Sequence, residues 1–380
     1  MKIGIDATFT PHGGSLGHLL EFVTELSNKF TKADLILYTK KENLEVMGNF
    51  ITSKCTLRIS KSASYGNFFR VFWGQFCLPI WSMVDDLDIL FCPGNISPII
   101  KTTRIKAQWI ATVGPFSDDV YSTSRFSTSF VNFINKYFIL LSGYTSNVVI
   151  HESQYSKELF LSNYNYSTEA QFLIECGKDN FYEPSDTDIE SFNLIANITH
   201  DDLLCVSHLH PYKNIERLIG AFNSYITKHS SDIKLYIVGK KADQPYSSKL
   251  SQLVSKYSLE DRVVFTGMVT KHELRFAYSR CRLFIFPSLV ESSGYTLIEA
   301  MACGAPILAS DRTAIPFTCQ DGAQYFDAYS QENLTSQIEI LLADKDELIL
   351  MRENSLKRAS EMMSYQEATH EFLRIVSSVK

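Results

Sequence analysis

The sequence lacks the features that mark several common classes of protein. None of its eight cysteines forms a C-x-x-C pair, which argues against a zinc site or a disulfide framework and favours buried, reduced thiols. No apolar run reaches the roughly 20 residues that cross a bilayer, and the start, MKIGIDATF, has no signal-peptide core. The formal net charge is −6, with the acidic excess in the second half, so nucleic acid is not expected as a partner. We therefore expect a cytoplasmic protein.

The chain does contain a regular alternation of short apolar runs and helical patterns. With 380 residues, it exceeds what one core usually organises, so two domains are expected. Residues 16–30 carry an apolar stripe with helical spacing. Alternation of this kind predicts parallel sheets with helical crossovers. The runs that predict strands are 1–9, 34–38, 88–92, 107–113 and 147–150, then 203–207, 233–239, 262–267, 283–288 and 305–310.

A turn-rich and acidic segment, CGKDNFYEPSDTD, separates the two halves and predicts a linker. We expect an α/β protein with two doubly wound, parallel-sheet, Rossmann-like domains at 1–178 and 179–362, and a terminal helix at 363–380. Ligands of such sheets bind beyond the C-terminal ends of the strands. A ligand is therefore expected in a cleft across which the two domains face each other.

The stretch 290–310, VESSGYTLIEAMACGAPILAS, contains the most informative cluster of polar residues. Glu291 follows a predicted strand, Gly294 precedes a predicted helix, and seven residues separate Glu291 from Glu299. A helix start suits an anion such as a diphosphate, whereas two carboxylates suit neutral hydroxyl groups of a sugar. A capping box of Thr296 with Glu299 is the alternative, in which Glu299 only caps its own helix.

This stretch resembles the signature of the family 4 retaining glycosyltransferases of GT-B fold, the group 1 glycosyl transferases of bacterial polysaccharide synthesis. The segments LHPYKNIERLIGAF, LYIVG, DRVVFTG and LFIFPS also stand in that family's order. The resemblance implies the GT-B fold. It further implies an acceptor-side first domain, a second domain that binds a nucleotide-sugar, and a last helix that crosses back to the first domain.

The resemblance also implies roles for individual residues. Glu299 would bind the ribose hydroxyls, Glu291 would contact the donor sugar, and Lys213 would neutralise the leaving diphosphate; Glu291 and Lys213 are the expected catalytic pair. The other expected donor-binding residues are Gly294, Tyr295 and Thr296 at the phosphates, Met268 and Val269 beside the base, Gly13 and Gly14 in a loop that closes over the donor, and His208.

Two departures from the family pattern bear on these roles. Many members have Gly-Arg where this chain has Ser207 and His208, and a histidine is mostly neutral at pH 7. Lys213 must then supply more of the charge stabilisation. Where many relatives have His-Asp, residues 112–116 read TVGPF, so the residues on the acceptor side of the site stay unassigned.

The expected activity is the transfer of a sugar from a nucleotide-sugar to a hydroxyl of a glycan or lipid-linked glycan, with retention and without a metal or other cofactor. Bacterial surface polysaccharide, including lipopolysaccharide, is the expected setting. The base, the sugar and the acceptor stay unassigned. A non-catalytic nucleotide-sugar-binding subunit and a sugar-nucleotide epimerase remain alternatives.

The aromatic stretch 68–81, FFRVFWGQFCLPIW, is expected to bury against the first sheet. The alternative is a patch that faces a membrane, which Arg70 supports weakly. In that case the protein would be peripheral at the inner face of the membrane.

Overall fold

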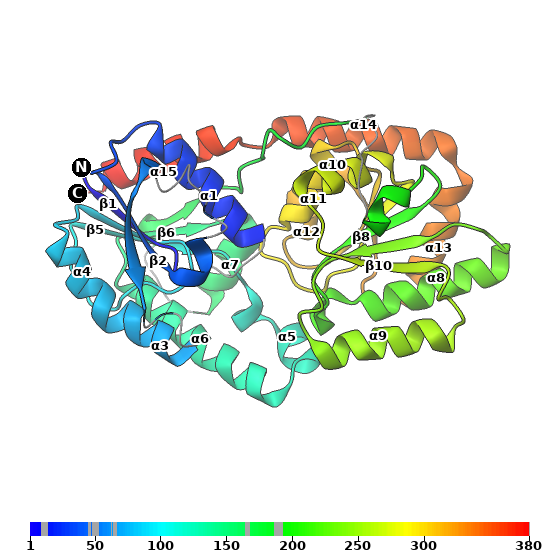
Figure 1. The fold of residues 1–380 in the computed structure, drawn as a ribbon, viewed down its shortest axis with the longest axis horizontal. Helices are drawn as coiled ribbons and strands as arrows, with labels where there is room; N and C mark the ends of the chain where they lie inside the picture. Colours follow the sequence, from blue (N-terminus) through cyan, green and yellow to red (C-terminus); the bar gives the residue numbers. More distant parts are fainter. Residues whose placement is uncertain are drawn as a thin grey trace. The chain divides into compact units, whose positions relative to one another are not determined.

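The structure is a computed structural model of the 380-residue chain. It describes residues 1–8, 14–44, 47, 53–61, 63, 67–163, 168–185 and 193–379. The chain forms two compact units: unit 1 comprises 1–116, 126–177 and 363–380, and unit 2 comprises 117–125 and 178–362. Figure 1 shows a sheet flanked by helices in each unit.

Unit 1 contains a sheet of seven parallel strands in the order β3-β2-β1-β4-β5-β6-β7. Its central strands β1, β4, β5 and β6 consist wholly of buried residues, as expected for a parallel sheet that is covered on both faces. The strands are β1 Ile3–Asp6, β2 Leu35–Lys40, β3 Thr56–Ser60, β4 Ile89–Cys92, β5 Ile105–Ile110, β6 Val148–His151 and β7 Gln171–Leu173.

Helices cover both faces of this sheet, and alternate strand residues show which helix lies on which face. Phe91 of β4 packs with α1 and α15 on one face. Its neighbour Leu90 packs with α4 on the other face, where Val149 of β6 packs with α6 and α7. The helices are α1 Gly14–Ser27, α3 Asn67–Phe72, α4 Leu78–Val84, α6 Phe126–Tyr144, α7 Gln154–Ser162 and α15 Tyr365–Ser378; a π-helical turn, Trp73–Cys77, joins α3 to α4.

The helix α15 completes the core of unit 1 although it follows all of unit 2 in the sequence. A capping box of Ser364 with Glu367 starts it. The ring of Phe372 then lies 4.7 Å from the ring of Phe91 and 5.5 Å from that of Phe22. The last helix of the described chain therefore belongs to the same core as β4 and α1.

Unit 2 contains a sheet of six parallel strands in the order β10-β9-β8-β11-β12-β13. The strand order reverses between β8 and β11, and ligands of doubly wound sheets bind at such a reversal, beyond the C-terminal strand ends. The strands are β8 Leu203–Val206, β9 Leu235–Val238, β10 Val263–Gly267, β11 Leu283–Phe286, β12 Ile307–Ser310 and β13 Gln324–Phe326.

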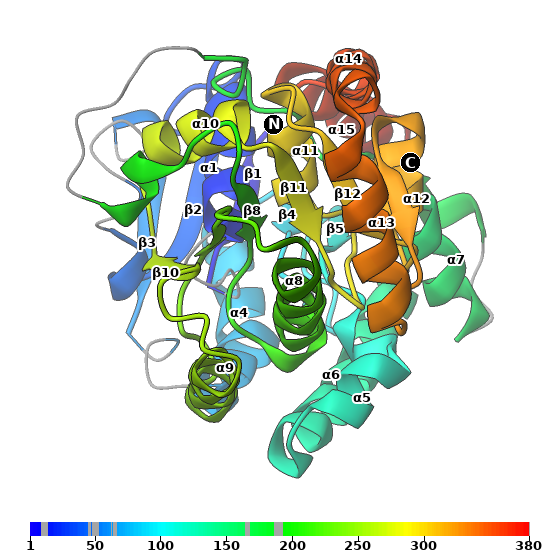
Figure 2. The same ribbon diagram turned by 90° about the vertical axis from the view of Figure 1, so that its right-hand side faces the viewer.

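Both faces of this second sheet are covered as well. In Figure 2, α8 and α9 lie below the strands, and α10 and α11 lie above them. The lower helices pack with Leu203 and Ile285, whereas Phe284 faces Tyr278 of α10 at 5.3 Å. The helices are α5 Asp118–Thr123, α8 Ile215–His229, α9 Gln244–Lys256, α10 Lys271–Arg280, α11 Tyr295–Ala302, α12 Ile315–Cys319, α13 Gln331–Ala343 and α14 Lys345–Glu361.

The division of the chain differs from the expected domains at one segment. Residues 117–125 were expected in the first domain, but they group with unit 2. Polar contacts explain the difference, because Tyr329 donates a hydrogen bond to Asp119 at 2.6 Å and Arg125 pairs with Asp243 at 3.2 Å. These contacts join residues about 120 to 210 positions apart in sequence, so the local pattern could not reveal them.

The expectation that the aromatic stretch 68–81 buries against the first sheet is only half right. Trp73 and Leu78 are buried, and both pack on the sheet. Phe72, Phe76 and Ile80 are exposed. The stretch is helical, so only one of its sides can contact the sheet.

The cysteines behave as their apolar surroundings predict. All eight are free; seven are buried and Cys77 is half-buried. Among the described residues, no helix has both the length and the apolar character required to cross a membrane.

Candidate active site

The central strands of unit 2, β8 and β11, bring the candidate catalytic residues together. Lys213 closes a short 3-10 turn, Pro211–Lys213, that follows β8, and Glu291 lies in the loop that follows β11. The amide of Leu289 donates a hydrogen bond to the carbonyl of Tyr212 at 2.8 Å. The two loops are thus joined at the point where the strand order reverses.

Asn214 fixes the turn that carries Lys213. It adopts a left-handed conformation with φ 59°, which asparagine tolerates better than most residues. Its buried side-chain amide donates hydrogen bonds to the carbonyls of Pro287 at 3.1 Å and Ala328 at 3.0 Å, and its oxygen accepts one from Arg217 at 2.6 Å. One side chain therefore connects the segments that follow β8, β11 and β13. The sequence analysis did not identify Asn214.

Lys213 and Glu291 form an ion pair. The ammonium nitrogen lies 2.5 Å from Glu291 Oε1, and the side chains are only 16% and 13% exposed. The ammonium also lies 5.3 Å from the ring of Tyr212 and 5.8 Å from that of Phe286, within the range of cation–π attraction. Burial lowers the pKa of Lys213, but the charges of Glu291 and Tyr212 outweigh it and the net pKa is raised. Lys213 is thus a fixed positive charge at neutral pH.

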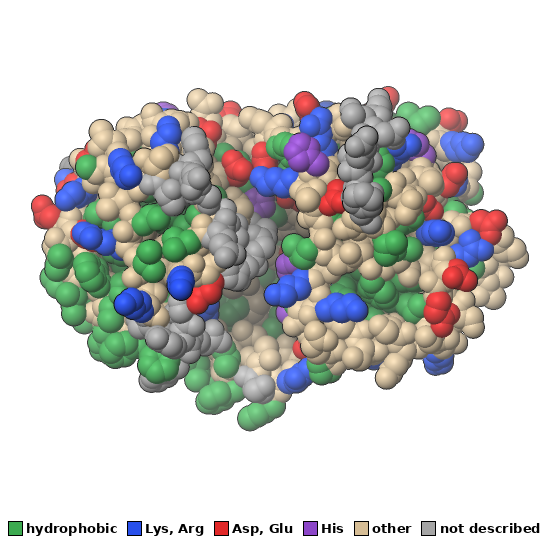
Figure 3. Space-filling view, viewed as in Figure 1, with side chains coloured by type: hydrophobic (Ala, Val, Ile, Leu, Met, Phe, Trp, Pro, Cys, Tyr) green, Lys and Arg blue, Asp and Glu red, His purple; other side chains and the backbone are tan. Residues whose placement is uncertain are grey.

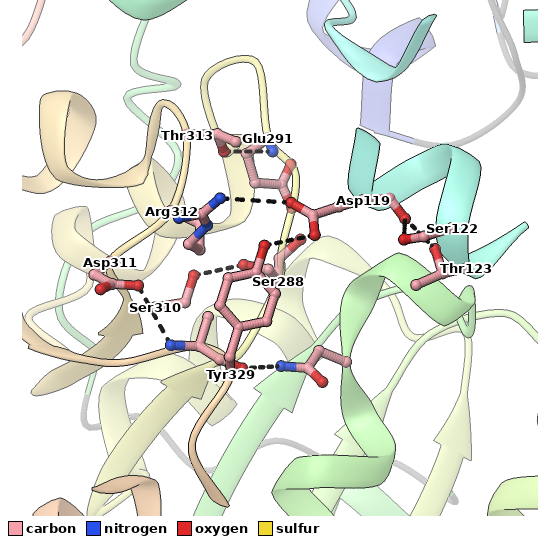
Figure 4. A network of polar contacts seen from close by, with 12 residues as sticks. Asp119, Ser122, Thr123, Ser288, Glu291, Ser310, Asp311, Arg312, Thr313 and Tyr329 are labelled. Atoms are coloured by element: carbon pink, nitrogen blue, oxygen red, sulfur yellow. Dashed lines mark hydrogen bonds and ion pairs between the residues drawn. The ribbon is translucent and has the colours of Figure 1, made fainter. Parts of the chain in front are cut away.

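A second contact positions Glu291 from the neighbouring strand end. The amide of Glu291 donates a hydrogen bond to the hydroxyl of Thr313 at 2.9 Å, as Figure 4 shows. Thr313 follows β12 and has φ 51°, a conformation that a β-branched residue rarely adopts. Thr313 holds its hydroxyl against the Glu291 backbone in spite of this strain.

The glycine before α11 is required by the backbone. Gly294 has φ 79°, and a β-carbon there would lie 2.9 Å from Cδ1 of Leu297. The helix begins directly after it, at Tyr295, and Gly294 is its N-cap. The hydroxyl of Thr318 donates to the carbonyl of Ser293 at 2.6 Å and holds the chain just before the helix. The positive end of the α11 dipole thus lies on the same loop as Glu291.

Glu299 does not cap its own helix. No side chain caps α11, so the capping-box alternative is wrong. Instead, Tyr278 donates a hydrogen bond to Glu299 Oε2 at 3.2 Å. Burial raises the pKa of Glu299 to about 7, although the hydrogen bonds from Tyr278 and Tyr182 act in the opposite direction. The helix therefore carries a carboxyl group that titrates near neutral pH.

His208 is held as a neutral side chain. Its Nδ1 accepts a hydrogen bond from the amide of Lys240 at 3.2 Å. Burial and the nearby charges of Lys213 and Lys240 lower its pKa. The backbone beside it is tightly packed, because a β-carbon on Gly239 would lie 2.1 Å from the carbonyl oxygen of Ser207. His208 thus adds no positive charge beside Lys213.

The remaining expected donor-binding residues do not all lie in this group. Tyr295 and Thr296 form the first turn of α11. Met268 and Val269 follow β10, which is separated from β8 by β9. Met268 is exposed, and its carbonyl accepts a hydrogen bond from Asn193 at 3.5 Å. Gly14 starts α1 in unit 1, and Gly13 lies outside the described residues.

Figure 4 also shows a cluster that the sequence analysis missed. Arg312 and Tyr329, from the segments after β12 and β13, both contact Asp119 of α5. The guanidinium of Arg312 lies 3.7 Å from the Asp119 carboxylate and 4.9 Å from the ring of Tyr329. The same helix α5 packs on the turn that carries Lys213. The only local signal was two adjacent aspartates after a proline.

Comparison with known proteins finds a family match in the second unit. Residues 186–359 match the family model described as glycosyl transferases group 1. The matched stretch is somewhat less than half of the chain. It includes the Lys213–Glu291 pair, Gly294 and Glu299, whereas Gly13, Gly14 and Asp119 lie outside it.

The curated relatives of this chain are distant in sequence. "Probable sucrose-phosphate synthase" of Thermosipho melanesiensis is 28% identical over 237 residues, which are 61% of this chain and 53% of the relative. The alpha-monoglucosyldiacylglycerol synthase of Streptococcus pneumoniae is 28% identical over 247 residues, which are again 61% of this chain and 53% of the relative. The matches thus span about half the length of each relative.

The fold of this chain is also found among solved structures. HepE of Anabaena, in complex with UDP and glucose, matches with a TM-score of 0.76 over 100% of both chains, at 18% sequence identity. At this identity the likeness establishes the fold alone. The fold is GT-B, with two Rossmann-like, parallel-sheet domains, as expected.

Proposed function

We propose that this protein is a retaining, metal-independent glycosyltransferase of family 4 that transfers a sugar from a nucleotide-sugar to a hydroxyl of a glycan or lipid-linked glycan. The observation that carries the proposal is the charged Lys213, paired with Glu291 at the strand reversal of unit 2. The loop of Glu291 leads directly to Gly294 and the start of α11. Positive charge and the positive end of a helix therefore converge where a diphosphate would bind.

The arrangement can stabilise a departing nucleoside diphosphate. When the bond between the anomeric carbon and the phosphate oxygen breaks, negative charge develops on the β-phosphate. An ammonium group has three donors, so Lys213 can donate to Glu291 and to that phosphate at the same time. Fixed charges of this kind act strongly in a site that excludes water. The acceptor oxygen then bonds to the anomeric carbon, and its proton passes to the departing phosphate.

Glu299 supports the nucleotide part of the proposal. A carboxylate on α11 that already accepts a tyrosine hydroxyl is suited to accept ribose hydroxyls in the same way. Met268 and Val269 are assigned to the base, and Gly13 and Gly14 to a loop over the donor. Because the Anabaena structure contains UDP and glucose, UDP is the nucleotide to test first.

The setting we propose is the synthesis of a surface polysaccharide or glycolipid on the cytoplasmic face of a membrane. The relative from Streptococcus pneumoniae is named for a glucosylated diacylglycerol, which supports an acceptor at a lipid surface. A nucleotide-sugar-binding subunit without turnover is the second candidate, and the neutral His208 in place of a second cation favours it.

A panel of nucleotides separates these candidates. Thermal unfolding is measured with UDP, GDP, ADP, CMP and dTDP, each in large excess. A ligand at about 100 times its dissociation constant adds roughly 2.7 kcal/mol to the free energy of unfolding, which raises the midpoint by a few degrees. One stabilising nucleotide identifies the donor class, and hydrolysis of the matching sugar nucleotide then supports transfer. Nucleotide binding with neither hydrolysis nor transfer supports a binding subunit without turnover. Conversion of one sugar nucleotide to another supports a sugar-nucleotide epimerase. If no nucleotide binds, the transferase, the binding subunit and the epimerase are all contradicted.

Lys213→Met tests the assigned catalytic charge. Loss of a preorganised charge at the transition state should lower kcat by at least about 100-fold, while nucleotide binding persists. The matched control is Lys249→Met, since Lys249 is an exposed lysine of α9 paired with Glu216 and should leave kcat unchanged. Normal turnover in Lys213→Met would remove the role assigned to this residue.

A further inference from the structure

The outer sides of α3 and α4 in unit 1 are apolar and exposed. Exposed large side chains recur at intervals of three or four residues, which places them in one stripe along a helix. Phe76 is 58% exposed and Val84 67% exposed, although both are residue types that usually lie in a core. The stripe consists of Phe69, Phe72, Phe76, Ile80, Met83 and Val84.

A second stripe runs along α6. Phe126 is 88% exposed, and residues at helical spacing continue the stripe to the end of the helix. The opposite side of α6 packs on the sheet through Ile139. A helix that is apolar on both sides is typical of one that is covered on both sides. The second stripe consists of Phe126, Phe130, Phe133, Tyr137, Leu141 and Tyr144.

The two stripes lie on the same side of unit 1. Leu90 packs with α4 and Val149 packs with α6, both on the sheet face opposite α1 and α15. Val71 of α3 joins the same cluster as Ile139, so the helices are neighbours there. Figure 3, in the view of Figure 1, shows hydrophobic side chains gathered over α3, α4 and α6 at the lower left. We call these two stripes the apolar face.

The loop beside α4 extends the apolar face and adds positive charge. The amide of Ile99 donates to Gln75 Oε1 at 3.0 Å, and the hydroxyls of Ser82 and Thr102 lie 2.5 Å apart. Ile100, 62% exposed, and the exposed Lys101 therefore lie next to α4. Arg104 follows in the same loop and is exposed.

The apolar face contains no negative charge of its own. Neither 67–84 nor 126–144 includes Asp or Glu, and Lys136 is the one charged residue of α6. The neighbouring helix α7 packs on the same side of the sheet but presents Gln154 and Glu158 to solvent. An apolar outer side is thus a property of these particular helices and not of every helix on this side.

We propose that the apolar face binds the surface of a bilayer that contains anionic lipid. Aromatic and aliphatic side chains on one side of a helix enter the boundary between headgroups and acyl chains. Lysine and arginine at the edge of such a surface attract anionic headgroups. Nearly half of the exposed large hydrophobic side chains in the described part of the chain lie on this face or its loop, whereas surface hydrophobic residues of a monomer are normally scattered.

A bilayer fits this face better than a second copy of the chain does. In a symmetric dimer, the same surface meets itself, so Lys101 and Arg104 would approach the cations of the partner with no carboxylate from these helices to pair with. Anionic headgroups complement those cations. The assignment of the face does not depend on catalysis; only its use to reach a lipid-linked acceptor rests on the proposed function.

Vesicle flotation tests the proposal. The full chain is mixed with vesicles of phosphatidylcholine, with and without phosphatidylglycerol, and the floated fraction gives a partition coefficient. We expect binding to the anionic vesicles that weakens with salt. Phe76→Glu/Ile80→Glu and Phe130→Glu/Tyr137→Glu should each lower the coefficient at least about tenfold. Lys101→Gln/Arg104→Gln should lower it about 25-fold on anionic vesicles.

Controls make each outcome decisive. Ile349→Glu/Leu350→Glu changes two exposed apolar residues of α14 in unit 2 and should leave the partition unchanged. All the substituted side chains are exposed, so thermal midpoints should stay near the wild-type value. The proposal is overturned if the wild-type chain does not float, if the α14 variant loses binding as the others do, or if the substitutions only convert a dimer to a monomer. The same variants should keep the increase in thermal midpoint that nucleotide produces. If the wild type shows no such increase, the proposed function is refuted and the membrane result still stands.

Discussion

Glu299→Gln is the substitution that most directly tests the electrostatics of the site. Burial raises the pKa of Glu299 from 4.5 to about 7. Near pH 6 the folded chain therefore keeps a proton on this group that the unfolded chain has released. Since the unfolded state binds fewer protons there, the contribution of Glu299 to the free energy of unfolding falls as the pH rises from about 4.5 to about 7. Glutamine cannot titrate, so the variant should lack this slope.

The size of the effect follows from the two pKa values. An interval from 4.5 to about 7 corresponds to on the order of 3 kcal/mol when the titration is complete. Part of that change occurs below pH 5, so the wild type should lose about 2 kcal/mol relative to the variant between pH 5 and pH 8. Groups such as Asp179 and Lys271, which also act on this carboxyl, are present in both proteins, so the difference isolates Glu299.

Urea unfolding at a series of pH values measures this difference. Far-UV circular dichroism reports both units, while the fluorescence of the three tryptophans reports unit 1, where all of them lie. The change should appear in the transition of unit 2. Glu183→Gln is the matched control, because its side chain is largely exposed in the same unit, and it should leave the pH dependence of the wild type unchanged. If the free energy of unfolding changes with pH in the same way in the wild type and in Glu299→Gln, the raised pKa assigned to Glu299 is refuted.

Two further substitutions test the backbone of the site. Gly294→Ala should destabilise unit 2 by about 1 to 2 kcal/mol in urea unfolding, because residue 294 has a φ of 79° and a β-carbon there would contact Leu297. The control Gly17→Ala lies in a helix with nothing near the new β-carbon, so it should stabilise the protein by about 0.5 to 1 kcal/mol. Equal effects of the two substitutions would contradict the steric argument. Asn214→Ala removes the donors to Pro287 and Ala328 and should cost about 2 to 3 kcal/mol. Calorimetry would show the loss, and an unchanged midpoint would mean that Asn214 does not hold these strand ends together.

The sequence predicted the strand ends of unit 2 well because the chemistry there is local. Apolar runs of four or five residues followed by Gly, Pro or polar residues mark where parallel strands end, and ligand sites gather at those ends. This placed Glu291 and Gly294 in the loop after β11, whereas Lys213 was identified from the family resemblance alone. It could not show that Lys213 pairs directly with Glu291, because that contact joins residues 78 positions apart.

The features that were missed depend on contacts between distant segments. Asn214 follows the expected lysine, but its role requires Pro287 and Ala328. Asp119 requires Arg312 and Tyr329, and no periodicity indicates such a meeting. The aromatic stretch 68–81 was expected in the core since aromatic residues usually lie there. Composition alone does not distinguish the buried side of a helix from an exposed apolar side.

The position of α15 in the chain bears on how the protein folds during synthesis. Phe372 of α15 packs against Phe22 and Phe91 in the core of unit 1, yet it is made after the whole of unit 2. A ribosome adds about 5 to 20 residues per second, so unit 1 must wait for nearly 200 further residues before that face of its sheet is covered. During this interval the aromatic side chains of α1 and β4 are exposed to chaperones and to other nascent chains. Unit 1, whose sequence begins first, is therefore the unit that finishes folding last.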